Sequence, residues 1–308
     1  MKKKDLMLIF HDPDNYFFPS LKRLVYPPYE HKEHGALYYI YRAMNFFKLP
    51  SSFFWGKWKK RVASVKKIII FDYGYQTGME KYIKKINPSC EVFLFCWNKI
   101  SKVYNSCFNF SYKDYIYSSD IYDCEKYGLK FNHIFYPSMF HKEWDDNLKN
   151  KLYYLSSDKG RVNTLLRLRK TLLDSGLDCS IKIFSFATNI DPDFRDSFEK
   201  IRISYKIPYK QYLKEALSCG IFLDITQDGQ SAFTLRIIES LVFSRKLITN
   251  NKLVVNAPFY NSNNILIIDT NNLPDVETIK EFISKPFIPY TEQEILKYGF
   301  VHWINNFT

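Results

Sequence analysis

The sequence predicts an α/β fold made of two domains, each a parallel sheet with crossover helices. Apolar strand-like runs alternate with helical stretches along most of the chain, and this alternation is typical of parallel sheets. The same scheme starts again near the middle of the sequence, so we expect two separate sheets. The length of 308 residues also suits two domains of about 150 residues each.

In the first half, several apolar runs have the length and composition of strands. They are DLMLIF at 5–10, KKIIIFD at 66–72, EVFLFCW at 91–97 and FNHIFYP at 131–137. Helices are expected at 35–49 and 77–86, with a short segment at 119–127. A helix between successive strands is the usual connection in parallel pairing.

The second half repeats this scheme independently. Its expected strands are KLYYLSS at 151–157, SIKIFSF at 180–186, KIRISY at 200–205, GIFLDI at 220–225, RKLITN at 245–250 and NILIID at 264–269. Its expected helices lie at 162–175, 209–218 and 234–244. This order again predicts a sheet with crossover helices.

The boundary between the domains is expected in the polar stretch HKEWDDNLKNK at 141–151, which has the composition of a hinge. We therefore expect a first domain at 1–145 and a second at 146–308. A final helix at 291–305 carries much apolar surface. We expect it to pack back across a cleft between the domains.

Composition narrows the class of protein. The formal charge of +12 and the pI near 9.2 favour partners that carry phosphate, whether nucleic acid, lipid headgroup or nucleotide. The six cysteines show no paired CxxC spacing, so neither a zinc site nor a disulfide framework is indicated. No run of about 18 apolar residues occurs and the start of the chain does not read as a signal peptide, so we expect a cytoplasmic protein.

Ligands of doubly wound sheets bind at the carboxyl ends of strands. The polar or aromatic residues at or just after the carboxyl ends of the predicted strands include His11, Asp72, Trp97, Asn98, Ser156, Ser157, Asp158, Tyr205, Asp224 and Asn250. After 151–157, Gly160 lets the backbone approach a ligand, and Lys159 with Arg161 can neutralise a diphosphate. The alternative at this loop is a helix cap by Asp158 with two solvated cations.

The stretch 220–269 reads as a strand, a glycine-bearing turn, a helix and two further strands. At this turn an anionic ligand would meet free backbone amides, which indicates a nucleotide-diphosphate site. Arg236 and Glu239 lie three residues apart on one helix face, so a surface ion pair is the alternative. Neither G-x-G-x-x-G after a strand nor G-x-x-x-x-G-K-[ST] occurs, which disfavours dehydrogenases and P-loop proteins.

These motifs resemble those of bacterial glycosyltransferases that build lipopolysaccharide O-antigens and capsular polysaccharides. The resemblance covers about 151–269 and rests on DKGR at 158–161, the tyrosines at 205, 209 and 212, DITQDGQ at 224–230, TLRIIE at 234–239 and KLITNN at 246–251. Such enzymes have the GT-B architecture, in which two Rossmann-like domains face a cleft. The second domain binds a nucleotide sugar and the first binds the acceptor. Some members of this neighbourhood are galactofuranosyltransferases.

The resemblance implies a donor site in the second domain, with a uridine diphosphate sugar as the expected donor. Lys159 and Arg161 would hold the diphosphate in place of a metal ion, so no cofactor is expected. Backbone amides at 231–234 would receive phosphate, and Glu239 would accept hydrogen bonds from ribose. Tyr205 would stack on the base or serve as a packing residue. The other expected donor-binding residues are Asp224, Gln230, Ser231, Thr234 and Arg236.

An inverting transfer also needs a base, which the first domain should supply from a strand end. Asp72 is the first candidate. His11 is the second, because the pKa class of histidine suits proton uptake near neutrality. For either residue the alternative is a polar side chain that only caps a loop, and a retaining transfer needs no such base. The Asp-Pro-Asp triplets at 12–14 and 191–193 read as turns, so no metal site is expected.

The stretch 22–61 interleaves basic and aromatic residues. This composition suits a surface that faces an anionic membrane, and the alternative is a partly buried domain face with a cationic rim. The sequence thus predicts a metal-independent hexosyltransferase that acts on a glycolipid or oligosaccharide acceptor at the inner face of the plasma membrane, without nucleic acid. Two alternatives stay open, a non-catalytic nucleic-acid-binding protein and a GT-B-like nucleotide-sugar epimerase.

Overall fold

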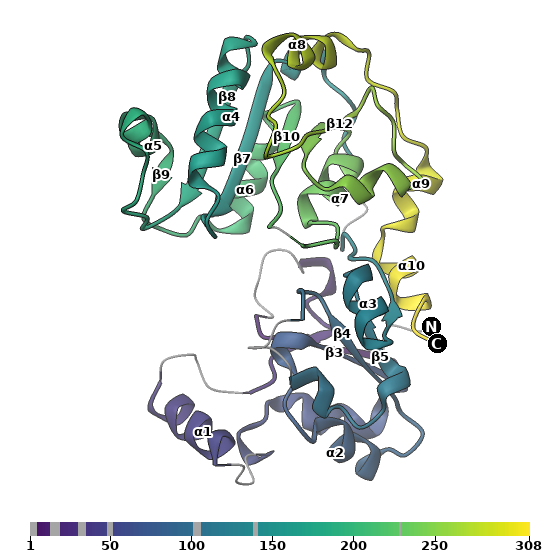
Figure 1. Cartoon of the computed structure of the whole chain (residues 1–308). Coiled ribbons are helices and arrows are strands. Elements are labelled where there is room, and N and C mark those ends of the chain that lie inside the picture. Colours follow the sequence, from purple (N-terminus) through teal and green to yellow (C-terminus); the bar gives the residue numbers. More distant parts are fainter. Residues whose placement is uncertain are drawn as a thin grey trace. The chain divides into compact units, whose positions relative to one another are not determined.

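The computed structural model of the chain describes residues 5–12, 19–29, 35–47, 52–100, 106–137, 141–227 and 229–308. The chain divides into two compact units (Figure 1). Unit 1 comprises Met1–His133 together with Asn305–Thr308, and unit 2 comprises Ile134–Ile304. The boundary predicted after residue 145 lies later in the chain than the division after His133. The prediction also assigns all of 146–308 to the second domain, whereas 305–308 belong to unit 1. The arrangement of the units about a cleft stays a prediction.

The described part of unit 1 contains a parallel sheet in the order β2-β1-β3-β4-β5-β6. The strands are β1 (Leu6–Ile9), β2 (Val25–Tyr26), β3 (Lys67–Phe71), β4 (Glu91–Cys96), β5 (Ile116–Ser118) and β6 (Lys130–Phe131). The α-helices are α1 (Ala36–Phe46), α2 (Met79–Ile86) and α3 (Ile121–Tyr127). Short 3-10 helices are η2 (Pro19–Leu21), η3 (Ser52–Phe54), η4 (Lys57–Ser64), η5 (Asp72–Gly74), η6 (Ser106–Asn109) and η7 (Lys113–Tyr115).

Both faces of the unit 1 sheet are covered, which explains why its strands are apolar throughout. On one face, Ile70 belongs to a buried cluster with Trp58 of η4 and Met79 of α2. On the other face, the rings of Phe93 and Phe307 lie 5.4 Å apart between centroids. The last residues of the chain therefore complete the core of unit 1.

The described part of unit 2 contains a second parallel sheet in the order β12-β11-β10-β7-β8-β9. The strands are β7 (Lys151–Ser157), β8 (Asp178–Phe184), β9 (Arg202–Ile203), β10 (Ile221–Asp224), β11 (Lys246–Thr249) and β12 (Ile265–Ile267). The α-helices are α4 (Val162–Asp174), α5 (Arg195–Ile201), α6 (Tyr209–Ala216), α7 (Leu235–Val242), α8 (Val276–Ser284), α9 (Glu292–Lys297) and α10 (Phe300–Asn305). The 3-10 helices are η8 (Asp146–Leu148), η9 (Pro192–Phe194) and η10 (Lys252–Asn256).

Helices cover the unit 2 sheet on both sides. Successive residues of a strand point to opposite faces, so neighbouring residues of β7 contact different helices. Leu152 joins Leu165 of α4 and Phe282 of α8 in one buried cluster. The next residue, Tyr153, contacts Tyr212 of α6 on the other side, with ring centroids 5.6 Å apart. This layering gives unit 2 the doubly wound architecture expected from the sequence.

The predicted α/β class with two parallel sheets is confirmed, although several elements differ. The run 200–205 forms only β9, because its first residues complete α5. The run 131–137 contributes to β6 only at its start, and Pro137 at its end lacks the amide hydrogen that a strand requires. The predicted helix at 291–305 is split into α9 and α10. Between them, the Tyr298 carbonyl accepts a hydrogen bond from Tyr136 N at 2.8 Å instead of continuing the helix.

Helix α1 and the nearby η3 expose large apolar side chains. The exposed residues are Leu37, Tyr39, Ile40, Phe46, Phe47 and Phe53, and Phe46 is 81% exposed. We call this set the α1 surface. In the described ranges, no helix has the length and apolar character needed to cross a bilayer.

Each sheet has one point where the chain reverses its winding direction. In unit 1 this point lies between β1 and β3, and in unit 2 it lies between β7 and β10. Loops at such a point leave a crevice at the carboxyl ends of the strands. We call the loops after β1, β3 and β4 the first edge. The loops after β7 and β10, with the start of α7, are the second edge.

Candidate functional site

Asp72 directly follows β3 in the first edge, and hydrogen bonds fix its carboxylate. Tyr73 N donates to Oδ1 at 2.9 Å, and Asn98 donates to Oδ2 from N at 2.9 Å and from Nδ2 at 3.1 Å. A carboxylate has about four acceptor positions, so with donors from the described residues one position remains on Oδ1. Burial raises the pKa of Asp72, while the hydrogen bonds from Asn98 and Tyr73 oppose that rise. A fixed carboxylate with a raised pKa is suited to proton uptake.

The structure places His11 beside Asp72, because β1 and β3 are neighbours in the sheet. The ring of His11 meets the ring of Tyr73 edge-on, with 5.4 Å between centroids. Positive charge on His11 lowers the pKa of Asp72. In the described part of the chain, Nδ1 of His11 is buried without a hydrogen-bond partner. The two predicted base candidates thus lie in one place.

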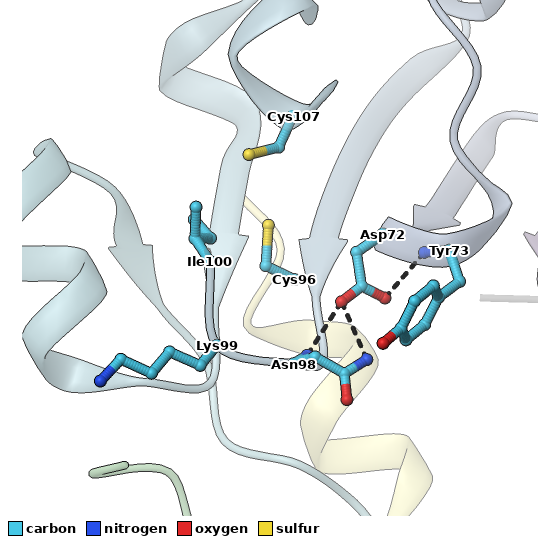
Figure 2. Close-up of a pocket in the computed structure, with 7 residues that line it drawn as sticks. All are labelled: Asp72, Tyr73, Cys96, Asn98, Lys99, Ile100 and Cys107. Carbon is cyan, nitrogen blue, oxygen red and sulfur yellow. Dashed lines mark hydrogen bonds between the residues drawn. The ribbon is translucent and has the colours of Figure 1, made fainter. Parts of the chain in front are cut away.

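A small hollow opens beside Asp72 (Figure 2). It is lined by Asp72, Tyr73, Cys96, Asn98, Lys99, Ile100 and Cys107. Its volume is about 10 Å³, which is room for about one water molecule. The thiols of Cys96 and Cys107 point toward each other, while Tyr73 and Asn98 lie next to the carboxylate (Figure 2). The hollow therefore brings a very small group into contact with Asp72.

In the second edge, Asp158 closes the loop after β7. Its Oδ1 accepts hydrogen bonds from Gly160 N at 3.0 Å and Arg161 N at 3.1 Å. Its Oδ2 accepts a hydrogen bond from Ser185 Oγ at 2.7 Å. Two amides that an anion would otherwise meet are therefore occupied, as in the alternative in which Asp158 caps the loop.

Arg161 bridges the point where the unit 2 sheet reverses direction. Its Nε donates to Asp158 O at 3.1 Å, and its Nη2 donates to Ser156 Oγ and Ser157 O, both at 2.7 Å. Its Nη1 donates to Ile225 O, just beyond β10. Since a guanidinium has five N–H donors, most of them are engaged by the protein. This geometry favours a positioning role for Arg161 over direct contact with a diphosphate.

Lys159 is the exposed cation of the same loop. The backbone of Lys159 has a φ of 48° and that of the following Gly160 has a φ of 82°, so both residues adopt the left-handed conformation. For a residue other than glycine this conformation costs about 1 kcal/mol. Partial burial and nearby Arg161 lower the pKa of Lys159. Among the described residues, the ammonium group has neither an ion pair nor a hydrogen bond.

Asp224 and Arg236 form an internal network instead of an open site. Asp224 is 1% exposed. Its Oδ1 accepts hydrogen bonds from Thr234 Oγ1 at 2.9 Å and from Arg236 Nη1 at 3.3 Å. Arg236 also donates to Leu155 O, which ties α7 to β7. The network holds the second edge together, and direct donor contact by Asp224 or Arg236 stays a prediction.

Glu239 is also buried, at 1% exposure. Tyr209 OH donates to its Oε1 at 2.6 Å, and Tyr212 OH donates to its Oε2. Burial raises the pKa of Glu239 to about 7, although both tyrosines and Arg236 lower it. The alternative of a surface ion pair between Arg236 and Glu239 is wrong, because this carboxylate is inside the unit. Each tyrosine hydroxyl fills one acceptor position on a carboxylate oxygen, and ribose binding by Glu239 stays a prediction.

Donor binding by the remaining predicted residues, Thr234, Ser231, Gln230 and Tyr205, stays a prediction. Thr234 caps α7, accepting a hydrogen bond from a backbone amide of its first turn at 3.4 Å. Ser231 is buried, and its carbonyl accepts a hydrogen bond from Asn251 Nδ2 at 3.4 Å. Gln230 is half-buried. Tyr205 is exposed and follows β9, which is an edge strand of the sheet.

Tyr73 and Ser185 contact the candidate residues but are not among the residues predicted from the sequence. Tyr73 lies one residue beyond the position directly after β3, so counting one more residue at each strand end would include it. Ser185 directly follows β8 but lies inside the run 180–186, which the sequence predicts as strand throughout. Among the described residues, no group of three or more His, Cys, Asp or Glu side chains is placed to hold a metal ion.

No family model and no curated protein matches the chain. Among solved structures, the crystal structure of TarM gives a TM-score of 0.44 at 11% identity, over 79% of this chain and 54% of that one. The glycosylation-associated protein Gap123 complex from Streptococcus agalactiae gives 0.40 at 11% identity, over 78% and 51%. The chain spans about half the length of both, and similarity at this level assigns no residue role.

Proposed function

We propose that the protein is a glycosyltransferase of GT-B type. It would move a sugar from a nucleoside-diphosphate donor, with uridine as the expected base, to a lipid-linked or oligosaccharide acceptor in bacterial surface polysaccharide synthesis. The observation that carries this proposal is Lys159, an exposed cation held in a strained turn where the sheet of unit 2 reverses direction. Positive charge that has no ion-pair partner among the described residues suits an anionic ligand at this point.

Lys159 would stabilise the leaving nucleoside diphosphate. Negative charge develops on the diphosphate as the bond to the sugar breaks, and a fixed cation lowers the energy of that state. Arg161 would keep the loop in shape through its hydrogen bonds to both strand ends. Because Lys159 supplies positive charge, we propose that transfer needs no metal ion or cofactor.

Asp72 would act as the base in an inverting reaction. Its remaining acceptor position would receive the proton of the acceptor hydroxyl, while the hydrogen bonds from Asn98 hold the carboxylate still. His11 would favour the ionised form of Asp72 through its charge. The first edge would thus activate the acceptor hydroxyl for transfer.

The α1 surface would bring the enzyme to its acceptor at the cytoplasmic face of the membrane. Exposed apolar residues such as Phe46 and Phe53 suit insertion among lipid headgroups. The adjacent η4 carries Lys57, Lys59 and Lys60, which would attract anionic lipids. Binding to vesicles containing phosphatidylglycerol, with none to neutral vesicles, would support this placement.

The donor site can be tested by calorimetric titration with uridine, guanosine, cytidine and deoxythymidine diphosphates. Lys159→Ala should weaken binding about tenfold, because it removes a charge-assisted contact. Lys159→Gly should weaken binding equally while unfolding less readily than Lys159→Ala by about 1 kcal/mol, because glycine tolerates the left-handed backbone. Lys170→Ala, which removes an exposed lysine of α4, is the matched control.

Equal affinity of all these variants for every nucleoside diphosphate would remove Lys159 from the donor site. Salt-sensitive binding of a single-stranded oligonucleotide, with no response to nucleoside diphosphates, would instead support the nucleic-acid-binding alternative.

A further inference from the structure

The hollow of the first edge has the size of one hydroxyl group. Its volume of about 10 Å³ holds about one water molecule and excludes a sugar ring. Asp72 and Asn98 line it with polar atoms (Figure 2). A hydroxyl oxygen is as small as a water molecule and makes the same kinds of hydrogen bond. A group of this class would therefore fit beside Asp72 while the rest of its molecule stays outside.

Polar atoms of Asp72 and Asn98 beside the hollow suit two neighbouring hydroxyl groups of a ligand. Asp72 has an acceptor position left on Oδ1 after accepting from Tyr73 N and from Asn98. Asn98 is exposed, and its amide uses one Nδ2 hydrogen on Asp72. In the described structure its Oδ1 is left without a hydrogen-bond partner. Adjacent hydroxyls could thus be bound by two different side chains.

An aromatic ring stands next to these polar atoms. Tyr73 is 43% exposed, so much of its ring meets solvent. Its backbone amide is bonded to Asp72, and His11 packs edge-on against its ring at 5.4 Å. The first contact holds the backbone of Tyr73, and the second packs against its ring. A hexose has C–H groups on one face and hydroxyls at its rim, so it matches an apolar ring beside a carboxylate and an amide.

We propose that the first edge binds a hexose ring of the acceptor, with one hydroxyl in the hollow at Asp72, Asn98 on an adjacent hydroxyl and the sugar face against Tyr73. This inference rests on the proposed function, and it names the class of acceptor and the residues that select it. Tyr73 and Asn98 are the selecting residues, since both contact the sugar without taking its proton.

The transfer step then balances as a substitution. The hydroxyl oxygen in the hollow forms a bond to the anomeric carbon of the donor, and its proton passes to Oδ1 of Asp72. The bond between the anomeric carbon and the phosphate oxygen breaks. Its electron pair leaves with the nucleoside diphosphate.

Binding of simple sugars tests this site without the donor. Saturation-transfer NMR would measure the affinity of methyl glycosides of glucose, galactose, mannose and N-acetylglucosamine. Tyr73→Ala should weaken the preferred glycoside by about two- to tenfold, and Tyr73→Phe should restore it. Asn98→Ala should weaken it by a similar factor. Tyr122→Ala removes another exposed tyrosine of unit 1, which is 48% exposed on α3, and should have no effect.

The inference is overturned if no methyl glycoside binds, or if Tyr73→Ala binds as well as the wild type does. It is also overturned if Tyr122→Ala is as weak as Tyr73→Ala. Uridine diphosphate titration separates this outcome from failure of the proposed function. If no glycoside binds but uridine diphosphate still binds in a Lys159-dependent way, only the acceptor site is rejected. If a glycoside binds but no diphosphate does, the transferase proposal is rejected and a carbohydrate-binding site remains.

Discussion

The two sheets share one winding pattern, yet their edges carry different side-chain arrangements. In the first edge, Asp72 keeps an acceptor position beside a hollow. In the second edge, Arg161 and Arg236 are engaged by carbonyl groups and by side chains of the same unit. Lys159 projects from that frame as an exposed cation. The comparison teaches that a charged residue at a strand end can either meet a ligand or hold the loops that do so.

The largest expected effect is at the first edge. Asp72→Asn should reduce kcat by about 10²- to 10⁴-fold, because an amide cannot take the proton of the acceptor hydroxyl. Affinity for uridine diphosphate should stay unchanged. The measurement is turnover of a uridine diphosphate sugar in the presence of a glycolipid acceptor. The control is Asp114→Asn, which changes an exposed carboxylate of the same unit. Undiminished turnover in Asp72→Asn would show that Asp72 is not the base.

At the second edge, stability should suffer most when the internal network is broken. Asp224→Ala leaves Arg236 buried without its carboxylate partner, which typically costs about 3 to 5 kcal/mol. Urea-induced unfolding measures this loss, and Asp174→Ala at an exposed position of α4 should change little. If Asp224→Ala kept its stability but lost affinity for uridine diphosphate, Asp224 would contact the ligand instead of stabilising the second edge.

The sequence predicts the class of fold well because apolar runs directly record burial on both faces of a parallel sheet. It also places Asp72 and His11 correctly at strand ends. Sequence position cannot show which atoms of a charged group are already used. Arg161 looks like a free cation in the sequence, yet its donors are engaged by Ser156 and by carbonyls. Those bonds depend on β7 and β10 being neighbours, which is a property of the topology.

A smaller effect concerns the pH dependence of unit 2. Burial raises the pKa of Glu239 to about 7 from an ordinary value of 4.5, so the folded state favours the protonated form. This stabilisation is present below pH 4.5 and is lost as the pH rises through about 7. Glu239→Gln, which stays neutral, should therefore gain stability over the wild type by about 1 kcal/mol or more from pH 5 to pH 8. Melting temperatures across that range measure the trend, and a constant difference between the two proteins would contradict it.

The smallest expected effect would show whether Asn98 tunes the base of the first edge. Its Nδ2 donates to Asp72 Oδ2 at 3.1 Å and so stabilises the ionised form. In Asn98→Ala that bond is gone while the backbone amide remains, so the pKa of Asp72 should rise. Since only the ionised carboxylate accepts a proton, the acidic limb of the kcat profile should move to higher pH by about one unit or less. Asn109→Ala, at an exposed position of η6, should leave the limb in place. A limb that stays fixed in Asn98→Ala, or moves to lower pH, would mean that a different group sets the acidic limb.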